Sequence, residues 1–403
     1  MLAPLFRTEF TKITAVLCKR LGISQMQVAE DIASETFLLA YETWPYKGVP
    51  ENPTAWLYAV AKNKLKNHLS RNQLFEGKIA PELKHAAPDR EEPDIDLSES
   101  HISDSQLQML FAICHPAIPP EAQIGLALRI LCGFGIEEIA TAFLTNKSTI
   151  NKRLFRAKEK LRTDNLPIEM PPAAEVKHRL DTVLTTLYLL FNEGYYSESH
   201  DAVLREDLCL EAMRLTRMLA DNALTAKPPV FALLALMCFH ASRFAARKNE
   251  HGAIILYENQ DESLWNRDLI AQGAFYLHQA SGGDSVSRYH LEAGIAYWHT
   301  IKEDLAEKWQ HILQLYNRLL MVEYSPVAAL NRTFALAKVK GNEAAIVEAE
   351  KLQLTDNQYY FTLLGELYRG IEPEKAKGYL QKAYALAKTA GDREVIRNKM
   401  EVL

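Results

Sequence analysis

The stretch from Gly133 to Leu161, GFGIEEIATAFLTNKSTINKRLFRAKEKL, decides how the chain can be interpreted. Apolar residues recur at helical spacing from Ile136 to Phe143, and a polar break follows at residues 145–147. A second helix is expected from Ser148, whose hydroxyl suits an N-cap. Two short helices joined by a polar turn predict a helix-turn-helix.

The second helix is expected to have two different faces. One apolar stripe, which must pack inward, consists of Ile150, Leu154, Ala157 and Leu161. The residues then left facing outward are Thr149, Lys152, Arg153, Arg156 and Lys160. A helix with one buried apolar face and one exposed basic face suits a DNA major groove. The residues at its N-terminus reach the bases, and the cations further along neutralise phosphates. The alternative is a solvated basic face, which any helical protein can carry.

Length and charge divide the chain further. With 403 residues, 48% of them hydrophobic, it is long enough for two or three domains with their own cores. Residues 1–73 carry nine basic and six acidic groups, and residues 105–165 carry eight and five. Residues 74–104 carry three basic and nine acidic groups. This distribution predicts two mildly basic modules separated by an acidic, flexible linker at 74–104.

No feature indicates a disulfide framework, a metal site or a membrane span. The five cysteines are scattered and form no CxxC pair, and Cys114 with His115 has no further Cys or His nearby. The longest apolar run, Val230 to Phe239, is far shorter than the roughly 18 residues that a span needs. There is no signal-like N-terminal segment. We therefore expect a cytoplasmic protein without metal or cofactor.

Residues 1–73 are expected to form a small helical module. Gly22 ends a first amphipathic helix, and Ser24 with Gln27 resembles a capping box for the second. After a loop that opens at Pro45, Asn52 and Pro53 mark the start of a third helix. The polar, cationic stripe of this third helix consists of Lys62, Asn63, Lys66, Asn67 and Arg71.

The second helix of this module carries Asp31 and Glu35 one turn apart, next to Phe37 and Leu38. A plain solvated surface is the simplest interpretation of this acidic pair. The stretches AEDIASETFLLAYETW (29–44), NPTAWLYAVAKNKLKNHLSR (52–71) and KRLFRAKEKL (152–161) give it another meaning. Together they resemble the extracytoplasmic-function (ECF) type of RNA polymerase sigma factor.

The resemblance implies an all-α protein with a promoter-melting region 2 at 1–73 and a helix-turn-helix region 4 at 105–168. It assigns Asp31, Glu35 and Phe37 to binding core RNA polymerase at the clamp helices of the beta-prime subunit. It assigns the third-helix stripe and the loop before it to the downstream promoter element. It assigns Thr149, Lys152, Arg153 and Arg156 of the second helix of the helix-turn-helix to the upstream element. Ser34, where glutamine is usual, and Ser148, where glycine is usual, depart from the family pattern.

Residues 169–403 exceed what a minimal sigma factor needs. Apolar helical periods continue throughout, and Leu363–Tyr368 followed by Ala376, Leu380 and Ala383 resembles a tetratricopeptide (TPR) helix pair. Segments 189–196, 258–270 and 325–341 resemble the C-terminal TPR-like extension of one ECF group. We expect this extension to regulate the factor and to bind an unknown ligand or protein.

No convergent acid, base and nucleophile can be named, so the sequence predicts no enzyme. Two functions remain open. The first is a sigma factor that directs promoter-specific initiation. The second is a TPR-type scaffold or signal-binding regulator with a helix-turn-helix and no role as a polymerase subunit. The chain carries no dimerisation heptad, which a repressor on a palindrome would favour, so the paired modules favour the first.

Overall fold

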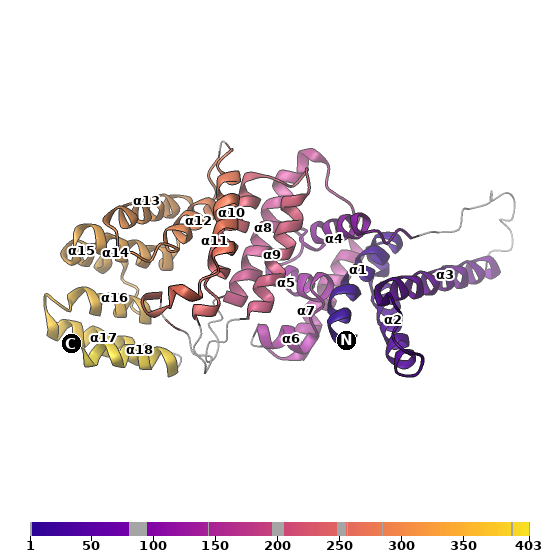
Figure 1. Ribbon diagram of the computed structural model, residues 1–403, viewed down its shortest axis with the longest axis horizontal. Helices are drawn as coiled ribbons and strands as arrows, with labels where there is room; N and C mark the ends of the chain where they lie inside the picture. The colour runs from indigo at the N-terminus through magenta and orange to yellow at the C-terminus, as the bar shows by residue number, and fades with distance from the viewer. Residues whose placement is uncertain are drawn as a thin grey trace. The chain divides into compact units, whose positions relative to one another are not determined.

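The computed structural model describes residues 2–79, 95–143, 145–195, 205–247, 255, 257–283, 285–387 and 390–402. Every regular element within these residues is a helix, which confirms the predicted all-α class (Figure 1). The chain divides into two compact units, residues 1–189 and 190–403.

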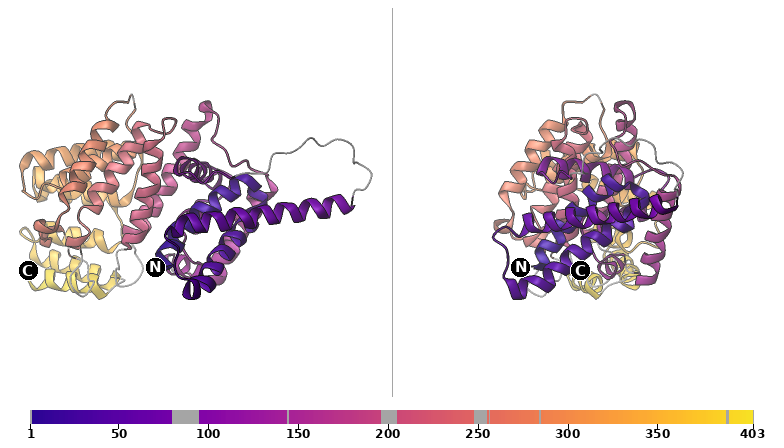
Figure 2. Two further views of the ribbon diagram at one scale, coloured as in Figure 1. Left: turned by 45° about the vertical axis from the view of Figure 1, so that its right-hand side comes forward. Right: turned by 90° about the vertical axis from the view of Figure 1, so that its right-hand side faces the viewer.

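The first unit begins with three helices: α1 (Leu2–Leu21), α2 (Met26–Lys47) and α3 (Pro53–Ile79), with a 3₁₀ turn, η1 (Ile23–Gln25), between the first two. Figure 2 shows α3 extending beyond the other two helices. The apolar sides of all three are buried in a common core, which includes Phe10, Ile13, Leu17, Ile32, Phe37, Leu57 and Leu65. Burial of these stripes stabilises the module.

The turns of this module follow from a few residues. Gly22 and Gly48 end α1 and α2 with φ of +87° and +81°, a conformation that favours glycine. The Asn52 side chain accepts a hydrogen bond from the Ala55 backbone N–H at 2.9 Å and caps α3, as predicted. Two predictions were wrong. Ser24 lies inside η1 and does not cap α2, and Pro45 lies inside the last turn of α2 instead of opening a loop.

The second bundle of the first unit contains α4 (Glu99–Ile113), α5 (Pro120–Leu126), the π-helical turn η2 (Ala127–Leu131), α6 (Ile136–Ala142) and α7 (Lys147–Thr163). The predicted linker at 74–104 is shorter than expected, because α3 continues to Ile79 and α4 begins at Glu99. Residues 80–94, the middle of that linker, lie outside the described residues.

The helix-turn-helix is formed by α6 and α7. Asn146, rather than the predicted Ser148, is the N-cap of α7: its side-chain oxygen accepts from the Thr149 backbone N–H at 2.8 Å. Lys147 Nζ lies 2.7 Å from Glu137 Oε1 and links the first turn of α7 to α6. Both Asn and Ser are good caps, and Asn146 starts the helix one residue before Ser148.

The two bundles are packed together in the first unit. Helix α1 packs on α4 and on η2, and α7 contacts η1. Between them, Ala15 and Cys18 of α1 and Ile23 of η1 are buried. The sequence predicts two modules on a tether, whereas the structure joins them through a shared apolar interface.

A further helix, α8 (Ala173–Tyr195), starts in the first unit and contacts the second bundle. Arg179 Nη2 donates to the Phe111 carbonyl at 2.5 Å. About two turns later, Thr186 Oγ1 donates to Gln123 Oε1 at 2.7 Å. The start of the predicted extension is therefore part of the fold that contains the helix-turn-helix.

The second unit is a succession of antiparallel helices. They are α9 (Glu206–Asp221), α10 (Pro228–Ala241), α11 (Arg267–Ala280), α12 (Arg288–Trp298), α13 (Ala306–Val322), α14 (Pro326–Lys340), α15 (Asn342–Leu352), α16 (Gln358–Tyr368), α17 (Pro373–Leu386) and α18 (Ala390–Glu401). Short 3₁₀ turns lie at η3 (Ala245–Arg247), η4 (Tyr257–Asn259) and η5 (Glu262–Leu264). Neighbouring helices pack in pairs, most closely α10 with α11, α13 with α14 and α16 with α17.

The α16–α17 pair shows why small residues recur in this unit. A Cβ on Gly365 would lie 2.6 Å from the Leu380 side chain, so only glycine permits the observed approach. Ala376, Leu380 and Ala383 are buried in this contact. The residues predicted to pair thus do so, while the resemblance of the whole extension to a TPR domain stays a prediction.

Candidate nucleic-acid interface

Helix α7 has the two faces that its spacing predicts. Ile150, Leu154, Ala157 and Leu161 are all buried, and Leu154 reaches Gly125 of α5, where an added Cβ would lie 3.2 Å from the leucine. Lys152, Arg156 and Lys160 are exposed on the other side. The reading helix is therefore fixed by its apolar back with its cations toward solvent.

Two of the predicted reading residues are held by neighbours. Thr149 is half-buried and its hydroxyl bonds Asn146 Oδ1 at 3.0 Å, so it belongs to the cap of α7. The Arg153 guanidinium lies over the Phe143 ring, 5.8 Å from its centre, so this ring at the end of α6 orients the arginine side chain. Lys160 pairs with Asp164 at 2.9 Å near the end of the helix.

Sequence reasoning missed Phe155. Its ring is 66% exposed on the solvent side of α7, between Arg153 and Arg156. An exposed phenylalanine has no packing role, and apolar side chains in a major groove contact the thymine methyl group. The signal was present in the sequence, because position 155 falls outside the apolar stripe.

The polar stripe of α3 also lies where it is predicted. Asn63, Lys66, Asn67 and Arg71 are exposed and Lys62 is half-buried. On the opposite side, Leu57, Ala61 and Leu65 are buried. Before α3, Tyr46 in the last turn of α2 is 89% exposed, and Val49 in the turn that follows is exposed as well.

The acidic pair on α2 is exposed, but Phe37 is not beside it. Phe37 is 4% exposed and packs against Phe6, with ring centroids 5.0 Å apart. Its predicted place on a docking surface does not agree with this burial, because position 37 is half a helical turn from Glu35 and faces the core. Leu38 and Tyr41 are the exposed apolar groups near the pair.

The two acids differ in their contacts. Glu35 Oε2 lies 2.7 Å from Lys64 Nζ of α3, and Asp31 Oδ1 accepts from Gln27 Nε2 at 3.0 Å. Both are exposed. Because exposed pairs are weak, these carboxylates remain available to a basic partner.

A third acid of α2 makes the contact between the two bundles. Glu30 is 5% exposed, and its Oε2 lies 2.6 Å from Lys158 Nζ of α7. Arg129 of η2 lies at 4.0 Å from the other oxygen. This buried pair joins residues 128 positions apart and fastens the reading helix to the helix that carries Asp31 and Glu35.

No group of three or more potential metal ligands occurs among the described residues. His115 Nδ1 accepts a hydrogen bond from the Ala117 backbone N–H at 3.2 Å, and burial raises the pKa of the Cys114 thiol to about 12. The His115 imidazole therefore belongs to the turn after α4, and the Cys114 thiol is a buried packing group. A search of the described helices finds none long and apolar enough to cross a membrane.

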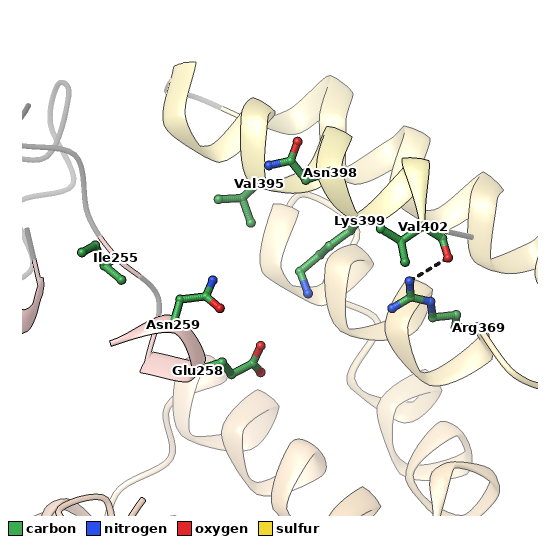
Figure 3. A pocket seen from close by; sticks show the side chains of 8 residues that line it. All are labelled: Ile255, Glu258, Asn259, Arg369, Val395, Asn398, Lys399 and Val402. Carbon is green, nitrogen blue, oxygen red and sulfur yellow. Dashed lines mark hydrogen bonds between the residues drawn. The ribbon is translucent and has the colours of Figure 1, made fainter. Parts of the chain in front are cut away.

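The second unit has a surface pocket of 410 Å³ between η4 and α18 (Figure 3). Glu258 and Asn259 lie on one side, and Asn398, Lys399 and Arg369 on the other. Its cations are already engaged: both Lys399 and Arg369 pair with Glu366, at 3.3 Å and 3.8 Å. The two cations of the pocket are therefore already neutralised by a carboxylate of the protein.

Comparison with known families matches this arrangement. Residues 6–75 match the family sigma-70 region 2, and residues 114–161 match sigma-70 region 4. Residues 179–281 match DUF6596, a family of unknown function. No solved structure is detectably similar to the chain.

Individual relatives fall into two kinds. An uncharacterised protein of Rhizobium meliloti is 35% identical over 384 residues, which cover 94% of this chain and 90% of that protein. The RNA polymerase sigma-H factor of Pseudomonas aeruginosa is 32% identical over 145 residues, covering 34% of this chain and 72% of the relative. The ECF RNA polymerase sigma-E factor of Haemophilus influenzae is 27% identical over 146 residues, covering 34% and 75%. The chain therefore belongs to the extracytoplasmic-function group of RNA polymerase sigma factors and carries a helical extension behind regions 2 and 4.

Proposed function

We propose that the chain acts as an alternative sigma factor, which binds core RNA polymerase and directs transcription initiation at its own promoters. The observation that carries this is the pair of sigma-70 regions, each with an exposed polar face on a buried apolar back. The chain has a binding role and no reaction of its own. As a sigma factor it acts in the cytoplasm, where core polymerase and promoter DNA are found.

The exposed face of α2 is the proposed contact with the clamp helices of the beta-prime subunit. Asp31 and Glu35 would contact basic groups of the clamp helices, and the exposed side chains of Leu38 and Tyr41 would supply apolar contact. Phe37 supports this face from inside, since its ring lies in the core against Phe6. An apolar centre with charged neighbours is typical of protein interfaces.

Reversing both charges, Asp31→Lys with Glu35→Lys, is expected to abolish copurification with core polymerase and the transcripts that start at cognate promoters. The fold should survive, because exposed charges contribute little to stability. The matched control is Glu51→Lys with Asp104→Lys, two exposed acids of the first unit that lie outside α2. Start-site mapping with the wild-type holoenzyme tests the sigma function itself. Normal copurification of the first double variant would contradict the assignment of α2.

The DNA contacts are proposed for two helices. Lys152, Arg153 and Arg156 of α7, with Thr149 at the cap, read the upstream promoter element, and Phe155 contacts a thymine methyl group. Lys160 contacts phosphate. The α3 stripe (Lys62, Asn63, Lys66, Asn67 and Arg71) binds the downstream element, where an extruded base is held as the strands separate.

Arg153→Ala is expected to weaken promoter binding by about 1 to 3 kcal/mol and to relax the preference at one position of the upstream element. Lys160→Ala is expected to weaken binding to all sequences alike and to lower the slope of log K against log salt by about 1, because it removes one phosphate contact. Binding is measured over a promoter library at several salt concentrations. If the two variants change the same positions by the same amount, the proposed orientation of α7 is wrong.

The extension is proposed to regulate the factor from within the chain, as a tethered domain acts at high effective concentration. In the alternative, a TPR-type regulator that is not a polymerase subunit, region 2 would have no function. Copurification of core polymerase with the wild-type chain separates the two functions.

A further inference from the structure

The second unit buries two cations against one aromatic ring. The Arg243 guanidinium lies 5.5 Å from the centre of the Tyr257 ring, and Lys308 Nζ lies 5.4 Å from the same centre. Arg243 follows α10, Tyr257 opens η4 and Lys308 lies in the first turn of α13. The two charged residues are only 8% and 1% exposed.

Among the described residues neither cation forms an ion pair with a carboxylate. Lys308 Nζ donates to the Ile301 and Glu303 carbonyls, at 2.5 Å and 3.4 Å, and to the Tyr257 hydroxyl at 3.2 Å. These acceptors are all neutral. Of the acids close in sequence to Lys308, Glu307 is exposed and lies 3.5 Å from His311. Asp304 is engaged by Lys338 at 3.0 Å and by the Trp309 indole.

Arg243 is the less satisfied of the two. Its Nη2 makes long contacts, 3.4 Å to the Tyr195 hydroxyl and 3.5 Å to His240 Nδ1, and its Nε has no hydrogen-bond partner within the described part of the chain. The indole Nε1 of Trp265, a 3%-exposed residue whose ring lies 6.1 Å from that of Tyr257, likewise has no partner among the described residues. In the part of the chain that the structure describes, two buried donors beside one ring thus lack an acceptor.

Burying Arg243 and Lys308 close together is energetically unfavourable unless a counter-charge is present. Buried charges are normally paired, and two like charges that share one ring repel each other in a low dielectric. Burial, reinforced by Arg243 and Lys308, lowers the pKa of the neighbouring His299 to about 3, so the histidine stays neutral and does not add to the charge. Asp304 and Glu303 partly oppose the lowering of the Lys308 pKa by burial, but among the described residues neither lies within ion-pair distance of it. An anion in direct contact with the two cations would offset the remaining cost.

We propose that Arg243, Lys308 and the Trp265 indole form a binding site for a small oxyanion, the carboxylate or phosphate group of a small molecule. The anion would accept hydrogen bonds from Arg243 Nε and Trp265 Nε1 and neutralise the two cations. Because these groups come from the segments around α10, η4, η5 and α13, its binding would tie together both halves of the second unit. The extension is then a sensor domain for an anionic ligand, and this inference does not depend on the sigma function of the first unit.

The test is calorimetric titration of the full-length protein with inorganic phosphate and, separately, with succinate, at constant ionic strength set with sodium chloride. We expect one of the two oxyanions to bind with one-to-one stoichiometry and to raise the melting temperature by about 3 °C at tenfold excess over Kd. Phosphate binding indicates a phosphorylated ligand, and succinate binding a carboxylic acid.

Arg243→Met is expected to reduce the affinity at least about tenfold, because it removes a charged donor from a buried site. Without anion the variant should melt at the wild-type temperature or above it, since it also removes an unpaired buried charge. The control is Arg267→Met, which removes an exposed cation of the same unit that pairs with Glu262 at 2.7 Å. If neither oxyanion binds more tightly than chloride, or Arg243→Met binds as well as wild type, the site does not exist.

Discussion

A chain that stops after Met170 is expected to lose the fold of region 4 and, with it, promoter-specific transcription. A chain that stops after Leu189 is expected to keep that fold. The difference between the two is the first part of α8, which the structure places in the first unit. Runoff transcription from a cognate promoter, combined with denaturant unfolding of each chain, measures both effects.

The reason lies in the turn between α4 and α5. The Gln123 side chain is buried and donates to the His115 and Ile118 carbonyls at 3.0 Å and 2.8 Å, which holds this turn closed. Its own oxygen accepts from Thr186 of α8 at 2.7 Å. Without α8 this oxygen loses both its partner and its cover, and the net loss of such a hydrogen bond costs about 0.5 to 1.5 kcal/mol.

Apolar contacts add to this loss. Arg179, Val183 and Thr186 fall on one face of α8, and the two polar members of the set bond the second bundle. Val183, between them, is fully buried. The chain that stops after Met170 lacks Val183, so the apolar surface that this side chain covered is exposed at roughly 25 cal/mol per Å². It also lacks Arg179, which bonds the Phe111 carbonyl in the full chain. The sum is a large share of the stability of a small domain.

The longer truncation then isolates the extension proper. If the extension is needed for activity, as the resemblance implies, the chain ending at Leu189 folds but initiates poorly. Full yield and unchanged promoter choice from this chain would make the second unit a passenger, and strong hyperactivity would make it purely inhibitory. A chain ending at Met170 that transcribes normally would contradict the structural role of α8.

Local sequence signals predicted the helices and their faces well. The stripe of α7 and the buried side of α3 follow directly from a period of 3.6 residues, and the Asn52–Pro53 start of α3 follows from capping. The errors are also local in origin. The resemblance assigned Phe37 to the polymerase contact together with the two acids, yet position 37 lies on another face of α2 and its ring packs against Phe6.

Long-range contacts could not be read from periodicity. Nothing near Glu30 indicates that its partner is Lys158, because each residue alone fits a solvated helix face. The same holds for Thr186 and Gln123, which are 63 positions apart. The charge pattern predicted two basic modules on an acidic tether. Only the structure shows that the modules share an interface and that α8 is bonded to the second bundle.

The Glu30–Lys158 pair carries the second large prediction. Lys158→Glu is expected to separate region 2 from region 4, because it places two carboxylates together at a site where Glu30 is 5% exposed. Breaking a buried pair from one side costs about 3 to 5 kcal/mol, and the partial exposure of Lys158 places this case toward the lower value. The swap, Glu30→Lys with Lys158→Glu, restores opposite charges and should recover most of the packing.

Distance measurement between fluorophores on the two bundles tests this directly. All five native cysteines are buried, so cysteines introduced at the exposed positions Ser70 and Ser148 can be labelled selectively. The single variant should show a longer and broader distance than wild type, and the swap should return it. The matched control is Lys147→Glu, which breaks the exposed pair with Glu137 within the helix-turn-helix and should leave the distance unchanged. An unchanged distance in Lys158→Glu would mean that the apolar interface of α1 with α4 and η2 holds the bundles without the pair.

If the distance does respond, the neighbouring positions of Glu30 and Asp31 have a consequence for initiation. A partner that binds the exposed side of α2 then acts on the helix whose opposite side fastens the DNA-reading helix.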